Sequence, residues 1–182
     1  FSKQQEMRTL TFKRGVHPKE SKEFSQHLPI EEVPLPPKVI IPLNQHTGAP
    51  LELLVQKGDR VKTGQILADS EAFFAAPVHS SVTGVVKKVG NFPSPLSPFG
   101  PGVEIKTEAE EEFDFDPDTS LDYSSLEREK IIESIRAGGI VGLGGAAFPA
   151  AVKFSPPPDT IIDNVILNGC ECEPYLTSDH RL

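Results

Sequence analysis

The fold of the first half of the chain is decided by the stretch Val55-Gln56-Lys57-Gly58-Asp59-Arg60-Val61-Lys62-Thr63-Gly64-Gln65-Ile66-Leu67. Its apolar segments are short and are separated by glycine turns, a pattern that is typical of small all-β domains. The segment Ser80-Ser81-Val82-Thr83-Gly84-Val85-Val86 repeats the arrangement of a glycine turn between small apolar segments. This echo predicts a quasi-symmetric β-sandwich, which we assign to residues 47–106.

Residues 47–106 resemble the barrel-sandwich domain of biotinyl and lipoyl carriers. In that family, a lysine at the tip of the hairpin that joins the two halves carries the cofactor. Here we expect the hairpin at Ser70-Glu71-Ala72-Phe73-Phe74-Ala75, which contains no lysine. A carrier function is therefore excluded by its chemistry, and a structural or docking function remains. Phe73 and Phe74 either pack within the domain or contact a partner.

Segments of different composition flank this domain. Residues 1–46 are polar and then rich in proline, which favours extended backbone over helix, so we expect an arm there. Proline and glycine are also frequent from Asn91 to Gly102, which predicts a stiff loop. The acidic residues between Glu108 and Asp118 predict a solvated linker over residues 107–123.

A helix and a glycine-rich loop open the last segment, residues 124–182. Ser124-x-x-Glu127 has the spacing of a capping box, and isoleucines then recur at helical spacing, so we expect a helix over residues 125–137. It is followed by Gly142-Leu143-Gly144-Gly145-Ala146-Ala147-Phe148-Pro149 and by Lys153. Such a loop either exposes backbone amides to an anion or a flat ring, or lets two helices pack closely. On these residues alone, both interpretations stay open.

A buried strand is predicted from Ile161 to Leu167. The polar segment Asn168-Gly169-Cys170-Glu171-Cys172-Glu173-Pro174 follows at its carboxyl end, which is where α/β sheets bind ligands. The amide of Asn168 can donate and accept, and the carboxylates of Glu171 and Glu173 can accept from ribose hydroxyl or amide groups. A ligand site and a charged turn both fit these residues.

Charge and composition exclude other classes of function. The chain has 18 Lys+Arg and 26 Asp+Glu, a formal net charge of −8, and no dense basic cluster, so we expect no nucleic-acid partner. No apolar run reaches the roughly 18 residues that span a bilayer, so we expect no direct membrane insertion. Cys170 and Cys172 are too close for an unstrained disulfide, which favours a reducing, cytoplasmic setting.

Several motifs occur together in this chain: Gly15-Val16-His17-Pro18, Gln45-His46-x-Gly48-Ala49, Gly58-Asp59, the glycine loop, and Asn168-x-x-Glu171-x-Glu173-Pro174. In this order they resemble the family of C subunits of the Rnf electron transport complex. The last two are also similar to the flavin-bearing subunit of respiratory complex I. The resemblance implies a mixed α+β fold, in which the barrel-sandwich domain is followed by the start of an α/β domain that binds FMN and NADH.

The resemblance also implies which residues bind these cofactors. Lys153 would lie near the ribityl phosphate of FMN, and Phe148 and Glu173 would face the nicotinamide nucleotide. The isoalloxazine ring would be surrounded by Asn168, Cys170 and Glu171. The flavin or a nucleotide would lie against Gly142, Gly144, Gly145 and Ala146. No side chain is implied as a catalytic acid, base or metal ligand. Each 4Fe-4S cluster needs about four cysteines, so clusters are expected only beyond Leu182.

The implied function is that of an NADH dehydrogenase-type oxidoreductase subunit. It would exchange electrons between NADH and FMN and pass them to iron-sulfur clusters of an ion-translocating ferredoxin:NAD oxidoreductase complex. Its partners would be NADH and the membrane and ferredoxin-like subunits of the Rnf complex, on the cytoplasmic side of the cell membrane. We expect the chain to be a truncated portion that is inactive alone. The alternatives are a docking scaffold for complex assembly, and a part similar to the A subunit of a Na-translocating NADH:quinone reductase.

Overall fold

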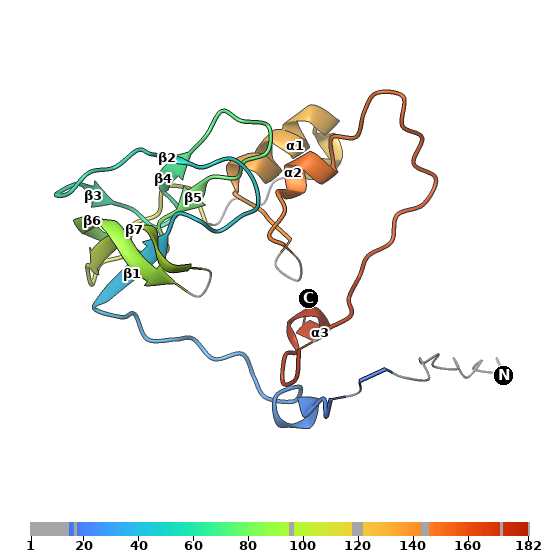
Figure 1. Ribbon diagram of the computed structural model, residues 1–182, viewed down its shortest axis with the longest axis horizontal. Helices are drawn as coiled ribbons and strands as arrows, with labels where there is room; N and C mark the ends of the chain where they lie inside the picture. The colour runs from blue at the N-terminus through green and yellow to red at the C-terminus, as the bar shows by residue number, and fades with distance from the viewer. Residues whose placement is uncertain are drawn as a thin grey trace. The chain divides into compact units, whose positions relative to one another are not determined.

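The computed structural model describes residues 15–16, 18–94, 97–117, 122–142, 146–171 and 173–181 (Figure 1). The chain divides into a central unit, residues 33–162, and a terminal unit, which combines residues 1–32 with residues 163–182. All strands of the described residues, and the helices α1 (Arg128–Ala137) and α2 (Ala150–Lys153), belong to the central unit. The terminal unit contains the short helices η1 (Lys22–Phe24) and α3 (Ser178–Arg181).

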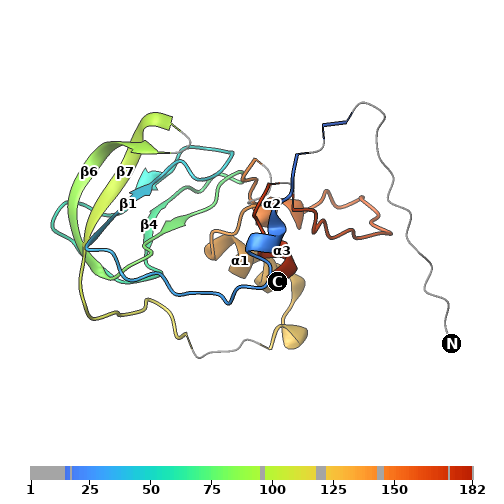
Figure 2. The same cartoon turned by 90° about the horizontal axis from the view of Figure 1, so that it is seen from below.

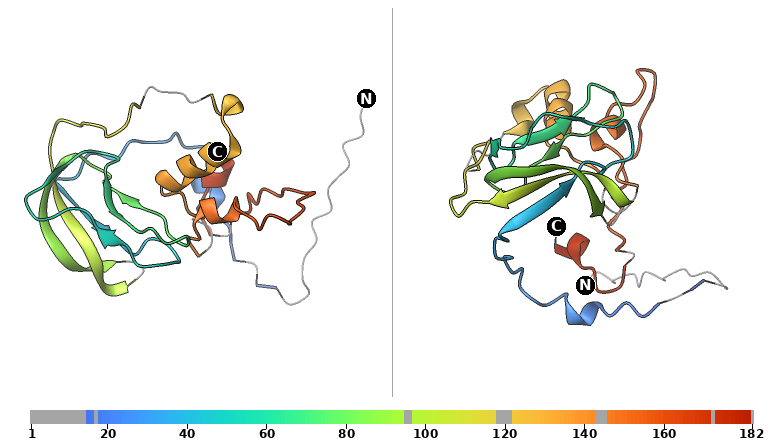
Figure 3. Two further views of the ribbon diagram at one scale, coloured as in Figure 1. Left: turned by 90° about the horizontal axis from the view of Figure 1, so that it is seen from above. Right: turned by 60° about the vertical axis from the view of Figure 1, so that its left-hand side comes forward.

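Two antiparallel sheets form the barrel-sandwich domain within the described residues. The strand order is β1-β7-β6-β3 in the larger sheet and β2-β4-β5 in the smaller one. Figures 2 and 3 show the long strands β6 and β7 curving along one side of the domain. The larger sheet consists of β1 (Lys38–Pro42), β7 (Ser97–Thr107), β6 (Gly84–Ser94) and β3 (Arg60–Val61). The smaller sheet consists of β2 (Glu52–Leu53), β4 (Ile66–Asp69) and β5 (Val78–His79).

The core of this domain is one apolar cluster to which strands of both sheets contribute. Val61, Val86 and Ile105 of the larger sheet are fully buried and join Leu67 of the smaller sheet in that cluster. Burial of these side chains supplies the main driving force for folding. The predicted glycine turns form: Gly58 and Gly64 have φ angles of 101° and 85°, a left-handed conformation that glycine adopts without steric cost. The barrel-sandwich prediction is thereby confirmed.

The larger sheet includes residues that we expected outside it. β1 lies in the expected arm and pairs with β7, from Lys38 opposite Lys106 to Pro42 opposite Gly102. The loop predicted from Asn91 to Gly102 is wrong, because β6 and β7 continue through it as a hairpin. Pro98 and Pro101 lie beyond the residues of β7 that pair with β1, and Pro93 lies beyond the residues of β6 that pair with β3. No ladder bond on those edges therefore needs their missing N–H donors.

The first part of the acidic segment is docked on the domain rather than freely solvated. The Thr83 hydroxyl donates to the carbonyl of Glu112 at 2.7 Å and accepts from its amide at 2.9 Å. Arg60 forms ion pairs with Glu108 at 2.9 Å and with Glu112 at 2.6 Å. The hydrogen bond from Arg60 lowers the pKa of the Glu112 carboxyl. The carboxylates of Glu108 and Glu112 thus both pair with Arg60 of β3.

The helix expected over residues 125–137 starts later than predicted. The α-helix α1 spans Arg128–Ala137, and the 3-10 helix η2 (Tyr123–Ser125) precedes it. The capping box does not form, because the hydroxyl of Ser124 donates to the carboxylate of Asp122 instead. The same carboxylate accepts the Ser124 amide at 3.1 Å. Such local side-chain bonds compete with helix capping, and Glu127 takes the N-cap position without a side-chain bond.

The buried strand predicted from Ile161 to Leu167 is wrong. This segment has no strand in the described residues, and Ile166 and Leu167 are 88% and 92% exposed. A continuous apolar strand needs neighbouring strands on its edges and covering elements on its faces. The sheets of the described residues do not extend to it. The α/β part of the predicted fold therefore does not rest on a strand at this position.

Candidate functional site

The two described flanks of the glycine loop, residues 139–142 and 146–149, pair with each other after α1. Val141 and Pro149 form an antiparallel bridge. The amide of Gly142 donates to the carbonyl of Phe148 at 3.0 Å, and the amide of Ala150 donates to the carbonyl of Ile140 at 2.9 Å. The short helix α2 (Ala150–Lys153) starts directly after this bridge. Two predicted site residues of the loop, Gly144 and Gly145, lie outside the described residues, and Ala146 is exposed beside them.

Lys153 brings a positive charge to the base of the glycine loop. Its Nζ lies 3.2 Å from the position that a Cβ atom on Gly142 would occupy, and 6.0 Å from the centre of the Phe148 ring. Because Gly142 has no side chain, the ammonium group faces bare backbone. An ammonium group next to accessible main chain suits a phosphate or another anion. The structure therefore brings Gly142, Phe148 and Lys153 together.

The remaining predicted site residues belong to the terminal unit. Asn168 Oδ1 accepts from the amide of Cys170 at 2.9 Å, which closes a side-chain turn. The carboxylate of Glu171 accepts from the amide of Asp179 at 2.7 Å, in the first turn of α3. Cys170 is exposed and carries a free thiol. Glu173 is exposed in the same turn region.

Lys22 is a residue of this region that sequence reasoning missed. Its Nζ donates to the main-chain carbonyls of Glu173 at 3.2 Å and of Leu176 at 2.8 Å. The carbonyl of Glu171 accepts a longer bond, 3.4 Å, from the same group. Lys22 also lines a cavity of about 180 Å³ together with Glu171 and Glu173. No spacing in the sequence signals this arrangement, because the lysine lies far from the motif along the chain.

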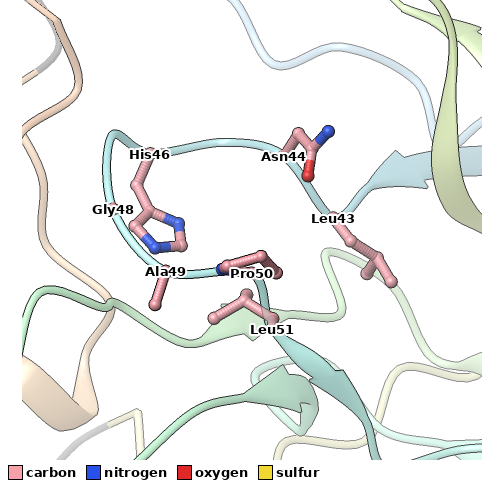
Figure 4. A pocket seen from close by; sticks show the side chains of 7 residues that line it. All are labelled: Leu43, Asn44, His46, Gly48, Ala49, Pro50 and Leu51. Carbon is pink, nitrogen blue, oxygen red and sulfur yellow. The ribbon is translucent and has the colours of Figure 1, made fainter. Parts of the chain in front are cut away.

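Two cavities of the central unit meet at His46, a residue of the motif Gln45-His46-x-Gly48-Ala49. The first, about 360 Å³, is lined by residues of the Leu43–Leu51 loop, and Figure 4 shows the His46 ring turned into this loop. The second, about 230 Å³, includes Gln45 and His79. Neither ring nitrogen of His46 has a hydrogen-bond partner of good geometry. Burial lowers the pKa of His46, although the hydrogen bond to the Ala49 backbone opposes the shift, and the lowered pKa favours the neutral form of the ring.

Metal ligation and membrane crossing find no support in the described ranges of the chain. Within them, no group of three or more His, Cys, Asp or Glu side chains is placed to hold a metal ion. The same ranges contain no helix with the length and apolar character needed to cross a membrane.

The described residues combine a barrel-sandwich domain whose hairpin has no carrier lysine with a glycine loop that has the Lys153 ammonium group beside it. The family models agree with this description. Residues 10–110 match the RnfC barrel sandwich hybrid domain, and residues 135–182 match the Nuo51 FMN-binding domain. The chain belongs to the RnfC family.

Curated relatives with similar sequences are components of oxidoreductase complexes. The chain is 45% identical over 171 residues to the C subunit of a proton-translocating ferredoxin:NAD(+) oxidoreductase complex from Clostridium ljungdahlii. It is 40% identical over 172 residues to the C subunit of a Na(+)-translocating complex of the same kind from Acetobacterium woodii. Each match includes 94% of this chain. The chain spans 37% and 39% of the lengths of these two relatives.

Proposed function

We propose that the chain forms the amino-terminal part of a peripheral electron-transport subunit that exchanges electrons between NADH and FMN. Iron-sulfur clusters of the same complex would receive the electrons, in an ion-translocating ferredoxin:NAD oxidoreductase. The observation that carries the proposal is the position of Lys153 beside the bare backbone of Gly142, within a segment that matches a flavin-binding family. The names of the relatives support the same assignment.

The residues of the glycine loop fit FMN chemically. The Lys153 ammonium group provides a charged donor for a phosphate, and Gly142 leaves the space that a phosphate or ring needs to approach the backbone. The Phe148 ring lies next to the same ammonium group and offers an apolar face. When bound, FMN supplies hydride acceptance from nicotinamide and single-electron release. The protein's contribution is to position the reacting rings and to set their electrostatic surroundings.

We propose separately that residues of the polar turn in the terminal unit contact the cofactors. Asn168, Cys170 and Glu171 would surround the isoalloxazine ring, and Glu173 would face the nicotinamide nucleotide. In complex I an acidic residue occupies the position of Cys170, so a polar contact made there in that family would be missing here. The backbone amide of Cys170 donates to Asn168 Oδ1, so this bond does not use the side-chain Nδ2–H donors of Asn168. These donors would then be available for an oxygen or nitrogen of the ring.

The proposal includes the partners and the location of the intact protein. We propose contacts with membrane-embedded and ferredoxin-like subunits of the Rnf complex, on the cytoplasmic side of the cell membrane. Iron-sulfur clusters would be held by segments beyond Leu182, since this chain has two cysteines and a single cluster takes about four.

FMN binding tests the proposal directly. We expect a chain lengthened to the size of its relatives, hereafter the extended chain, to quench FMN fluorescence in a titration. The 182-residue chain is expected to leave the fluorescence unchanged, because the family's flavin domain would be incomplete in it. If neither chain quenched the fluorescence, the flavin assignment would fail and the docking-scaffold alternative would gain support.

A further inference from the structure

Two segments of the barrel-sandwich domain hold the glycine loop in place. The first is the loop 44–49. Its Thr47 amide donates to the carbonyl of Ala147 at 3.0 Å, and its Thr47 hydroxyl donates to the carbonyl of Ala146. Ala147 has a φ of 52°, a left-handed conformation that is unfavourable for a residue with a Cβ atom. External contacts must therefore hold the backbone there, and Thr47 provides two of them on consecutive carbonyls.

The second segment is the hairpin 70–75, the place where carriers of this fold bear their lysine. The ring of Phe74 packs edge-on against the ring of Phe148, with centroids 5.9 Å apart. The main chain of Phe74 also joins the two segments, because its carbonyl accepts the amide of Ala49 at 2.8 Å. Phe73 packs on Phe74 at 5.2 Å. The residue that lies against the glycine loop is thus Phe74.

An arginine of α1 fixes the base of the same hairpin. Arg136 donates to the two carboxylate oxygens of Asp69 at 3.3 and 3.2 Å, and to the carbonyl of Ser70. Both partners are largely covered, with side-chain exposures of 33% for Arg136 and 29% for Asp69. A bidentate arginine pair of this kind sets orientation as well as distance. The helix that leads into the glycine loop is therefore tied to the strand that leads into the hairpin.

We propose that the loop 44–49 and the hairpin 70–75 form a clamp that fixes residues 146–149 at the end of the glycine loop, with Thr47, Phe74 and Arg136 as positioning residues for the flavin. The proposal rests on the proposed function for its flavin-binding consequence. The hairpin that holds a cofactor covalently in carrier proteins serves here as a rigid support for the segment that would hold a cofactor non-covalently. The clamp acts through Ala146, Ala147 and Phe148 and does not itself touch the ligand.

The clamp predicts separable effects on loop order and on flavin binding. Thr47→Val keeps the shape of the side chain and removes its hydroxyl, whereas Thr47→Ser keeps the hydroxyl. In the 182-residue chain, we expect Thr47→Val to speed hydrogen exchange at the amides of Gly142 and Ala150 several-fold. The serine variant should exchange like the unmodified chain. The amide of Val86, which donates to the Asp59 carbonyl in the barrel, serves as the internal reference and should exchange at an unchanged rate.

A second experiment measures the FMN affinity of the extended chain. Thr47→Val and Phe74→Leu are each expected to weaken binding about three- to tenfold, the loss of one well-placed contact. Phe113→Leu is the matched control, since the Phe113 ring packs edge-on against Phe115 with centroids 5.4 Å apart, outside the clamp, and its affinity should stay within about twofold.

The hydrogen-exchange experiment and the FMN-affinity experiment together distinguish failure of the clamp from failure of the proposed function. If the extended chain bound no FMN while Thr47→Val still loosened the Gly142 and Ala150 amides, the clamp would stand and the flavin assignment would fall. The clamp would be overturned if Thr47→Val left the exchange rates of the Gly142 and Ala150 amides unchanged and if Thr47→Val and Phe74→Leu both bound FMN with unchanged affinity. The flavin assignment would then remain intact.

Discussion

Replacing Lys153 with alanine in the extended chain is expected to weaken FMN binding about 10- to 100-fold. A charge-assisted hydrogen bond to a phosphate contributes roughly 1.5–3 kcal/mol, which corresponds to that range of affinity. The ammonium group already lies beside Gly142 and Phe148, so the native chain loses little conformational entropy in presenting it. The measurement is an FMN fluorescence titration of both proteins at the same ionic strength.

Two variants give this prediction its controls. Lys153→Arg keeps the charge and should retain more affinity than Lys153→Ala. Lys130→Ala removes a lysine of α1 that pairs with Glu133 at 2.7 Å, on the exposed surface of the helix. Its FMN affinity should equal that of the unmodified protein. If Lys153→Ala bound FMN as tightly as the unmodified protein, Lys153 would have no role at the phosphate.

Replacing Gly84 with alanine is expected to destabilise the 182-residue chain by about 1–3 kcal/mol, the cost of overpacking a well-filled interior. Gly84 is buried at the start of β6, and an added Cβ would lie 2.2 Å from the carbonyl oxygen of Lys106 and 2.9 Å from the Ile105 side chain. The neighbouring atom is backbone within a paired strand, so it cannot move aside without disrupting the sheet. Equilibrium unfolding in urea measures the change.

Gly90→Ala is the matched control on the same strand. The nearest atom to an added Cβ at Gly90 is the flexible end of Lys88, at 3.6 Å. The free energy of unfolding should therefore stay within about 0.5 kcal/mol of the unmodified value. If Gly84→Ala and Gly90→Ala lowered the free energy of unfolding equally, the close packing of β6 on β7 would not be the reason for glycine at position 84.

The barrel-sandwich fold was predictable because its signals are local. Glycine turns at Gly58 and Gly64 and short apolar segments between them depend on backbone preferences within a few residues. The β6–β7 hairpin was missed because its prolines are typical of loops. These prolines are compatible with strands because they lie beyond the residues that pair with β1 and β3, and both of those strands come from segments far away in the sequence.

The candidate site was predictable in part, for the same physical reason. The glycine loop and Lys153 lie within one short segment, and the structure brings Gly142, Phe148 and Lys153 together. Thr47 gave no functional signal, and Phe74 was expected to pack within the domain or to contact a partner. Their contacts with the loop were not predictable, because they join parts of the chain that are distant in sequence. The strand expected at Ile161–Leu167 carries the right apolar residues but has no neighbouring strand in the described residues to pair with.

The most direct test of the account is reduction of bound flavin by NADH. The extended chain, loaded with FMN and freed of excess flavin, is mixed with NADH under anaerobic conditions while the visible flavin absorbance is followed. We expect NADH to bleach the flavin absorbance. The Lys153→Ala protein should retain less FMN, and its loss of absorbance should be correspondingly smaller. Tightly bound FMN whose absorbance NADH leaves unchanged would contradict the proposed electron exchange.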